Sequence, residues 1–330
     1  MFEVPLMPHI TNTKGDKYTY LWLRKSGFST FDCYDALKDF FELDYKDINN
    51  QGLKDEEAIT EQLISVKKQI SQKEAGAFNK KFGFSANKFI QIKQILGTGP
   101  EPVKERMLHG NSFRITIRNL DAKTAQALVD YVAKHRNQTM VNYYDNQRFG
   151  MPGGPYNTHL IGKAIVEENW PQAYKHIKST KNEFEVKGRA NNPEHLKESF
   201  RCMHGKKLAF FVSSYSSHLW NNSVSCMVKI ATNSRSHHFE NVGKLHVPID
   251  HYFECPYVCV AEGYDFAPDH FKAMPKENSR SAVVHTTIYA GAVEADELHR
   301  NKKKVALSFF LPSGSYATML IRQIFLRLSK

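Results

Sequence analysis

Residues 113–133, FRITIRNLDAKTAQALVDYVA, contain both kinds of secondary structure from which the fold is built. Apolar side chains stand at every second position from Phe113 to Ile117, with Arg or Thr between them, which predicts a strand with one apolar and one basic face. Asn119 or Asp121 then offers a helix cap. The next apolar residues recur at helical spacing and predict a surface helix: Ala125, Leu128, Val129, Val132 and Ala133.

The same alternation of strands and helices continues toward the N-terminus. Residues 18–23 predict a buried strand, Ser29-Thr30 an N-cap, and the apolar positions from Ala36 to Phe41 a short helix. Ile90 and Ile92 predict a further strand, whereas residues 59–66 fit a helix or a strand. Because these elements follow no strict strand–helix–strand rhythm, we expect an α+β fold.

The composition changes at residue 150, where glycines and prolines up to Pro155 predict a domain boundary. Helical segments are expected at 162–168 and 209–229, and a polar return at 268–280. Two strands, 283–290 and 305–311, and a helix from about Tyr316 complete the chain.

Composition and charge limit the classes of protein. The 330 residues are 41% hydrophobic and carry a formal charge of +11, so the chain can bury a core and attract polyanions, with nucleic acid the first candidate. No apolar run reaches the length of a membrane span, and the start MFEVPLMPHI is unlike a signal peptide. We therefore expect a cytoplasmic protein without a membrane partner.

Motifs for metals, nucleotides and activated serines are missing from the sequence. The five cysteines are odd in number and irregular in spacing, which argues against a disulfide framework. Cys202 with His204, the pair His237-His238, and Cys255 with Cys259 do not match the usual metal-ligand spacings. GxGxxG, GxxxxGK[ST] and GxSxG are also missing. We expect neither a metal nor a cofactor.

A loop carboxylate remains as a candidate for chemistry. Lys54-Asp55 follows Gly52, which allows a tight turn able to bring a carboxylate to a ligand. By itself, such a pair is most often a solvated surface feature.

Five segments together resemble the TruD family of tRNA pseudouridine synthases. Residues 52–62, GLKDEEAITEQ, resemble the family's G-x-K-D-x-x-A-x-T-x-Q, and residues 110–113, GNSF, its G-N-x-F. Residues 142–150, NYYDNQRFG, and 311–318, LPSGSYAT, resemble N-Y-F-G-x-Q-R-F-G and L-P-x-G-S-Y-A-T. The fifth segment is K-x-G-x-x-T, formed by Lys25, Gly27 and Thr30.

The resemblance implies a pseudouridine synthase catalytic domain with a mixed, largely antiparallel sheet, at residues 1–152 and 280–330. An inserted α/β TRUD domain is expected at 153–279. Glu3 matches the family's early Glu, which puts the family's stacking Phe before Met1; matching Phe2 to that Phe would put Leu6 at the Glu. Asp145 stands where the family has Gly, and Gln323 where it has Glu.

The resemblance also implies a set of site residues. Asp55 is the expected catalytic residue, attacking C1′ of the uridine or removing the C2′ proton. Lys54, Arg148 and Arg322 are the candidate cations to keep it ionised. Phe113 is expected to cover the face of a flipped uracil and Asn111 to meet its edge. The expected substrate-binding residues are Asn111, Phe113, Arg148, Lys25, Glu3 and Tyr316.

Three of these residues also have a structural interpretation. Phe113 fits core packing beside Ile115, Arg148 fits a phosphate contact or a structural ion pair, and Tyr316 fits a buried ring at a helix start. We expect a tRNA pseudouridine synthase acting on uridine 13 of the D arm, with tRNA as partner and no obligatory protein partner. The alternative is an RNA-binding or tRNA-folding protein of the same fold with impaired catalysis. The insertion is expected to hold tRNA through Lys187-Gly188-Arg189 and Lys206-Lys207.

Overall fold

The structure is a computed structural model that describes residues 1–329 except 53, 57, 84–87, 105–107, 151–154, 179–195, 202 and 204. The chain divides into two compact units. Unit 1 comprises Met1–Ala133 and Ile288–Gly314, and unit 2 comprises Lys134–Thr287 and Ser315–Lys330. Much of the breaker cluster at 150–155, the pair Lys187 and Arg189, Cys202, His204 and the side chain of Lys206 lie outside the described residues.

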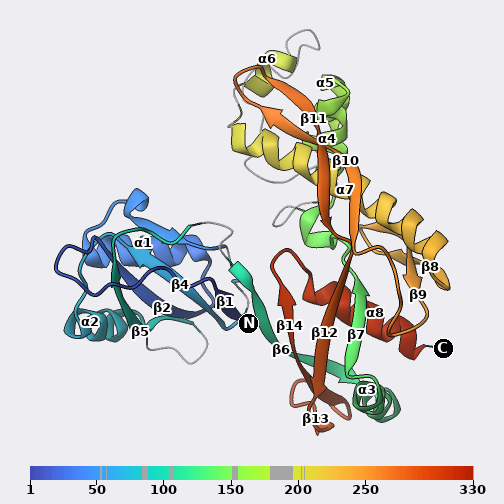
Figure 1. The fold of residues 1–330 in the computed structure, drawn as a ribbon, viewed down its shortest axis with the longest axis horizontal. Helices are drawn as coiled ribbons and strands as arrows, with labels where there is room; N and C mark the ends of the chain where they lie inside the picture. The colour runs from blue at the N-terminus through green and yellow to red at the C-terminus, as the bar shows by residue number, and fades with distance from the viewer. Residues whose placement is uncertain are drawn as a thin grey trace. The chain divides into compact units, whose positions relative to one another are not determined.

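Unit 1 is built on a mixed sheet with the strand order β5-β2-β4-β1-β6-β14-β12 (Figure 1). Its strands are β1 (Phe2–Pro5), β2 (Tyr18–Ser26), β3 (Ile48–Asn50), β4 (Thr60–Val66), β5 (Phe89–Gly99), β6 (Leu108–Leu120), β12 (Val283–Ala290), β13 (Glu294–Ala295) and β14 (Lys303–Pro312). β1 runs parallel to β4, whereas the other pairings are antiparallel. The predicted α+β class with a largely antiparallel sheet is confirmed.

The helices α1 (Thr30–Phe41) and α2 (Gln72–Phe82) share a hydrophobic core with β2, β4 and β5. Each begins with a capping box, Ser29 with Asp32 and Ser71 with Glu74. Leu21, Leu37, Ile64 and Phe78 are fully buried in that core. The short 3-10 helix η1 (Tyr45–Asp47) leads into β3, and α3 (Ala122–Lys134) follows β6.

Unit 2 combines helices with short antiparallel strands. Its elements are β7 (Asn137–Val141), η2 (Asn146–Arg148), α4 (Thr158–Val166), α5 (Trp170–Lys178), α6 (Leu196–Arg201), α7 (Gly205–Ala231), β8 (Ser234–Phe239), β9 (Gly243–Pro248), β10 (Val258–Ala267), β11 (Lys272–Ser281) and α8 (Ala317–Leu328). β8 pairs with β9, β10 with β11, and residues 283–287 of β12 with β7. The long helix α7 packs on β10 and on α4 (Figure 1). Gly162 permits the second contact, since a Cβ there would lie 1.9 Å from the Phe211 carbonyl oxygen.

Most predicted elements are confirmed. The strands at 18–23, 90–92, 113–117, 283–290 and 305–311 and the helices at 36–41, 125–133, 162–168, 209–229 and after Tyr316 all appear. The ambiguous stretch 59–66 is the strand β4, and Asp121 caps α3 by accepting from the Thr124 amide at 2.8 Å. The polar return predicted at 268–280 is wrong, because from Lys272 it is the strand β11, paired residue by residue with β10.

The compact units do not follow the domain boundaries drawn from the breaker cluster. Residues 134–152 and 315–330 belong to unit 2. β7 pairs there with the start of β12, and Gln323 of α8 bonds both backbone groups of Val141. These pairings hold both segments within unit 2.

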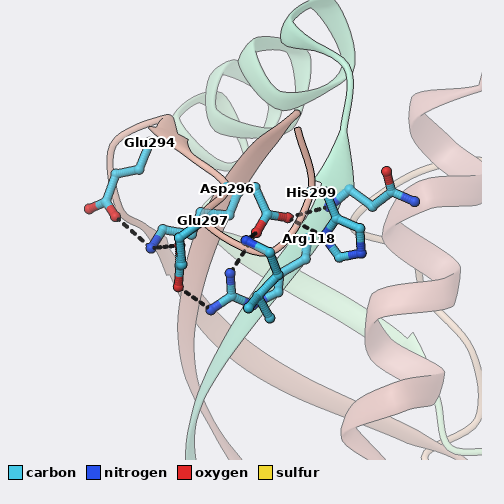
Figure 2. Close-up of polar contacts among 8 residues, drawn as sticks. Arg118, Glu294, Asp296, Glu297 and His299 are labelled. Carbon is cyan, nitrogen blue, oxygen red and sulfur yellow. Dashed lines mark hydrogen bonds and ion pairs between the residues drawn. The ribbon is translucent and has the colours of Figure 1, made fainter. Parts of the chain in front are cut away.

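A network of ion pairs joins β6 and β14 to the loop that follows β13 (Figure 2). The buried Asp296 carboxylate accepts from Arg118 Nη1 at 2.7 Å and from the Asn119 amide at 2.8 Å, and it lies 2.8 Å from His299. Glu297 pairs with Arg118 and with Lys304, at 2.8 and 2.6 Å. The donors hold the pKa of Asp296 well below its ordinary value despite its burial. We interpret this network as a structural link between β6 and the loop around β13.

Candidate active site

The Asp55 loop, residues 52–59 between β3 and β4, accepts hydrogen bonds from a buried lysine. Lys25 is fully buried, and its Nζ donates to the carbonyl oxygens of Phe28 at 2.8 Å, Lys54 at 3.2 Å and Asp55 at 2.6 Å. Burial lowers the pKa of Lys25, and the negative charges of Asp55 and Glu56 oppose this shift. The three carbonyls supply the hydrogen bonds that a buried ammonium requires.

The rest of the K-x-G-x-x-T segment holds the same loop. Thr30 Oγ1 accepts a hydrogen bond from the Lys54 amide at 3.0 Å. The Gly27 amide donates to the Glu56 carbonyl at 3.1 Å, with Gly27 at a φ of +67°, a conformation that glycine adopts without strain. All three residues of the segment therefore bind the backbone around Asp55.

A buried ion pair supports the loop from a second side. Lys54 Nζ lies 2.8 Å from Glu3 Oε1, and the two side chains are 2% and 0% exposed. The other oxygen, Glu3 Oε2, accepts from the Leu63 amide at 2.7 Å. The adjacent Asp55 side chain is exposed. This arrangement buries the charges of Lys54 and Glu3, while Asp55 itself stays accessible.

The sheet register brings the other predicted residues of unit 1 onto one face. Lys25 lies opposite Thr60, and Glu3 lies opposite Asn111. Directly opposed residues share a face, and so do residues two apart along a strand. Phe2 is paired with Glu61, so these two residues share one face of the sheet. Their neighbours Glu3 and Thr60 therefore lie together on the opposite face. Phe113 comes two positions after Asn111 and shares the face of Asn111. Lys25, Thr60, Glu3, Asn111 and Phe113 therefore form a row across four strands.

Polar atoms on this face have unused hydrogen-bonding capacity. Within the described part of the chain, Asn111 Oδ1, Thr60 Oγ1 and both amide atoms of Gln62 are buried without a protein partner. Phe113 is half-buried and stacks on Phe309, with ring centroids 5.4 Å apart and planes 27° apart. Buried polar atoms without partners are costly, so these groups are suited to a bound polar molecule or water.

The G-N-x-F glycine permits the strand pairing here, since a Cβ on Gly110 would lie 2.3 Å from the Leu311 carbonyl oxygen.

Arg148 and Tyr316 belong to unit 2 and are described within it. Arg148 donates to the hydroxyls of Ser217 at 3.0 Å and Ser213 at 2.8 Å. Tyr316 precedes α8, and its ring meets that of Tyr144 edge-on at 6.0 Å. Burial raises the pKa of Tyr316. Arg148 thus has neutral partners, and Tyr316 is part of an aromatic cluster.

Two of the three candidate cations for Asp55 pair with other carboxylates. Lys54 pairs with Glu3, and Arg322 lies 3.2 Å from Asp145 Oδ1. Asp145 is fully buried and also accepts from the Asn146 amide at 2.7 Å and from the Thr318 hydroxyl. The Asp that replaces the family's Gly therefore links the loop after β7 to the start of α8.

The second departure from the family pattern also has a structural partner. Gln323 is fully buried, its Oε1 accepts from the Val141 amide at 2.9 Å, and its Nε2 donates to the Val141 carbonyl at 2.8 Å. An amide supplies both a donor and an acceptor, whereas an ionised carboxylate only accepts. Gln323 thus matches both backbone groups of Val141.

Arg280 is not among the predicted site residues, and its guanidinium lies over the Tyr144 ring at 4.1 Å. No local pattern marks it, because the polar, mostly exposed residues of β11 lack the alternation of a half-buried strand. The described residues contain no group of three or more His, Cys, Asp or Glu side chains able to hold a metal ion. In the same part of the chain, no helix is long and apolar enough to span a membrane.

Comparisons with known proteins agree with this fold. The sequence model of the family described as tRNA pseudouridine synthase D (TruD) matches residues 2–189. The tRNA pseudouridine synthase D of Syntrophotalea carbinolica is 24% identical, covering 98% of this chain and 92% of its own length. That of Aquifex aeolicus is 23% identical, covering 94% and 92%. A crystal structure assigned as tRNA pseudouridine synthase D of Methanosarcina mazei superposes with a TM-score of 0.63 at 21% identity, covering 98% of this chain and 90% of its own.

The fold and the ordered motifs define a pseudouridine synthase, which is an isomerase. The chain belongs to the TruD family.

Proposed function

We propose that this chain converts uridine 13 in the D arm of tRNA to pseudouridine, with Asp55 as the catalytic residue. The observation that carries the proposal is the exposed Asp55 on a loop whose backbone is fixed by Lys25, Thr30 and Gly27. The names of the relatives, tRNA pseudouridine synthases D, support tRNA as the substrate.

The reaction rearranges bonds within one nucleotide. The N1–C1′ bond breaks, the uracil turns, a C5–C1′ bond forms, and the proton released from C5 is balanced by one gained at N1. Asp55 either attacks C1′ or removes the C2′ proton, and both roles need a carboxylate that reaches the ribose in a fixed orientation. The buried contacts beneath the loop supply that orientation, because they fix the backbone while leaving the side chain exposed.

The flipped base needs a flat apolar surface and hydrogen-bond partners. Phe113, held against Phe309, offers a half-buried ring, and Asn111 Oδ1 can accept from the uracil N3–H. Lys25 and Glu3 act on the loop in this proposal rather than on the RNA, since both side chains are buried and occupied by protein groups.

The test is to map pseudouridine by mass spectrometry in unmodified tRNA transcripts incubated with the protein. One new pseudouridine at position 13, lost when uridine 13 is replaced by cytidine, supports the proposal. Tight tRNA binding without any pseudouridine would instead favour an RNA-binding protein of the same fold.

A further inference from the structure

Unit 1 contains a cavity of about 300 Å³ that lies apart from the Asp55 face of its sheet. Tyr20 lines the cavity and stands five positions before Lys25 on β2, where the pairing with β4 is regular. Residues an odd number apart on a strand point to opposite faces of the sheet. Tyr20 packs with Leu63 and Val103, in a cluster separate from the core of α1 and α2. The cavity is therefore separate from the residues proposed to hold the reacting uridine.

Two segments form most of the cavity wall. Residues 6–9 follow β1, and residues 100–104 lie between β5 and β6. The lining side chains are mostly apolar: Leu6, Met7, Pro8, Pro100, Pro102 and Val103. Leu6 and Met7 are apolar but 48% and 51% exposed, so they present apolar surface to whatever enters. An apolar lining with few polar groups is typical of ligand sites.

The segment 100–104 is held by residues of two strands. The hydroxyl of the fully buried Tyr20 donates to the Glu101 carbonyl at 2.8 Å. The amide of Val103 donates to Ser65 Oγ at 3.0 Å. The wall is thus formed in the free protein, which spares a ligand the entropic cost of ordering it.

Gln51 is the buried polar side chain of the cavity. It is 3% exposed, and its Nε2 donates to the Leu6 carbonyl at 2.9 Å. Because a carbonyl only accepts, the amide cannot be reversed without placing two oxygens together, and Oε1 is fixed as an acceptor. Among the described residues, Gln51 Oε1 has no hydrogen-bond partner. The cavity is therefore suited to a ligand that brings an N–H or O–H donor.

We propose that this cavity binds an unpaired base of the RNA, other than the reacting uridine. The faces of the base contact the apolar wall, and an N–H on its edge donates to Gln51 Oε1. Unpaired RNA bases are bound in this way, through their faces and their edges, and the charge of +11 favours a polyanion. The inference rests on the proposed function for the identity of the RNA. Gln51 stands four positions before Asp55 and directly before its loop.

The first experiment measures the binding of unmodified tRNA by fluorescence anisotropy at 50 and 200 mM salt. Gln51→Met removes the acceptor, keeps a side chain of similar length and should weaken binding about fivefold. The ratio of the two affinities should stay that of the wild type, since no charge is removed. The single-turnover rate with saturating tRNA should change little. Gln126→Met is the matched control, because Gln126 is an exposed glutamine on α3 of the same unit, and it should bind like the wild type.

Met7→Ala tests the wall independently of Gln51. It shortens an apolar side chain that is half exposed, so the fold should not depend on it, and binding should again weaken with an unchanged salt dependence. Variants are compared only after thermal unfolding shows them folded; if Gln51→Met does not fold, Met7→Ala carries the test. Unchanged affinity in the folded variants, or an equal loss in Gln126→Met, would overturn the site.

A second experiment identifies the occupant. In protein labelled with ¹³C at the methionine methyl groups, the Met7 signal is the one missing from Met7→Ala. It should move when unmodified tRNA is added. A signal that moves with free uridine, cytidine, adenosine or guanosine but not with tRNA would identify a small-molecule site and overturn the proposal. Weaker tRNA binding by Gln51→Met, without any pseudouridine from the wild-type protein, would support the cavity and defeat the proposed function.

Discussion

Lys25 Nζ donates a 2.6 Å hydrogen bond to the carbonyl oxygen of Asp55 itself, so a buried ammonium acts directly on the residue expected to perform the reaction. Two further carbonyls share this ammonium. We therefore expect Lys25 to affect the proposed reaction through the backbone of Asp55.

Lys25→Met should disorder the Asp55 loop, because three carbonyls lose their donor. Each buried acceptor left without a donor lowers the free energy of unfolding by about 1–3 kcal/mol, so the variant should unfold at a lower denaturant concentration. Its pseudouridine formation under saturating tRNA should fall more than its affinity for tRNA, measured by single-turnover kinetics and anisotropy. A variant with a full saturated rate and weakened binding would show instead that Lys25 contacts the RNA.

The Glu3–Lys54 pair should be strongly coupled. Removing one partner leaves a buried charge, so Glu3→Gln and Lys54→Met should each destabilise the protein by about 3–5 kcal/mol. The double variant should lose much less than the sum, because no charge is then left unpaired. Denaturant unfolding of all four proteins checks this, and strictly additive losses would contradict the coupling.

His159 should make the protein acid-sensitive. Burial, with the neighbouring His218 and His176, lowers the pKa of His159 to about 4, below its ordinary value near 6.5. The unfolded chain therefore takes up a proton that the folded chain refuses, so stability should be present above pH 6.5 and fall progressively toward pH 4. His159→Phe, which keeps a ring against Phe149, should flatten this part of the unfolding profile, whereas a change at the more exposed His237 should alter it less. An unchanged profile in His159→Phe would refute the assignment.

Gln323→Glu, which restores the family residue, should destabilise this chain at neutral pH. A carboxylate would face the Val141 carbonyl that Gln323 Nε2 now bonds at 2.8 Å, at a cost of about 1–3 kcal/mol. Burial should raise the pKa of the new Glu, so part of the lost stability should return as the pH falls and the group protonates. Urea unfolding at pH 7 and pH 5 measures both effects, and equal stability of the two proteins at pH 7 would contradict the account.

The sequence was informative where one face of an element is apolar. The alternation from Phe113 to Ile117 predicted β6, and the Ser29 cap predicted the start of α1. β11 was missed because its mostly exposed polar residues and Pro275 lack a strand pattern, and its structure depends on pairing with β10. The resemblance places Lys25 and Glu3 at the substrate, but their burial was not predictable, because charged side chains are seldom buried. Only the structure shows that backbone carbonyls and Lys54 satisfy their charges.

The most direct test of the central claim is pseudouridine mapping with Asp55→Asn. This variant keeps the size of the side chain and removes its charge, while Lys25 still holds the backbone carbonyl of residue 55. The account predicts no pseudouridine at position 13 and tRNA affinity close to that of the wild type, with Asp39→Asn, an exposed aspartate of α1, fully active as the control. Pseudouridine formation by Asp55→Asn at a rate comparable to wild type would contradict it.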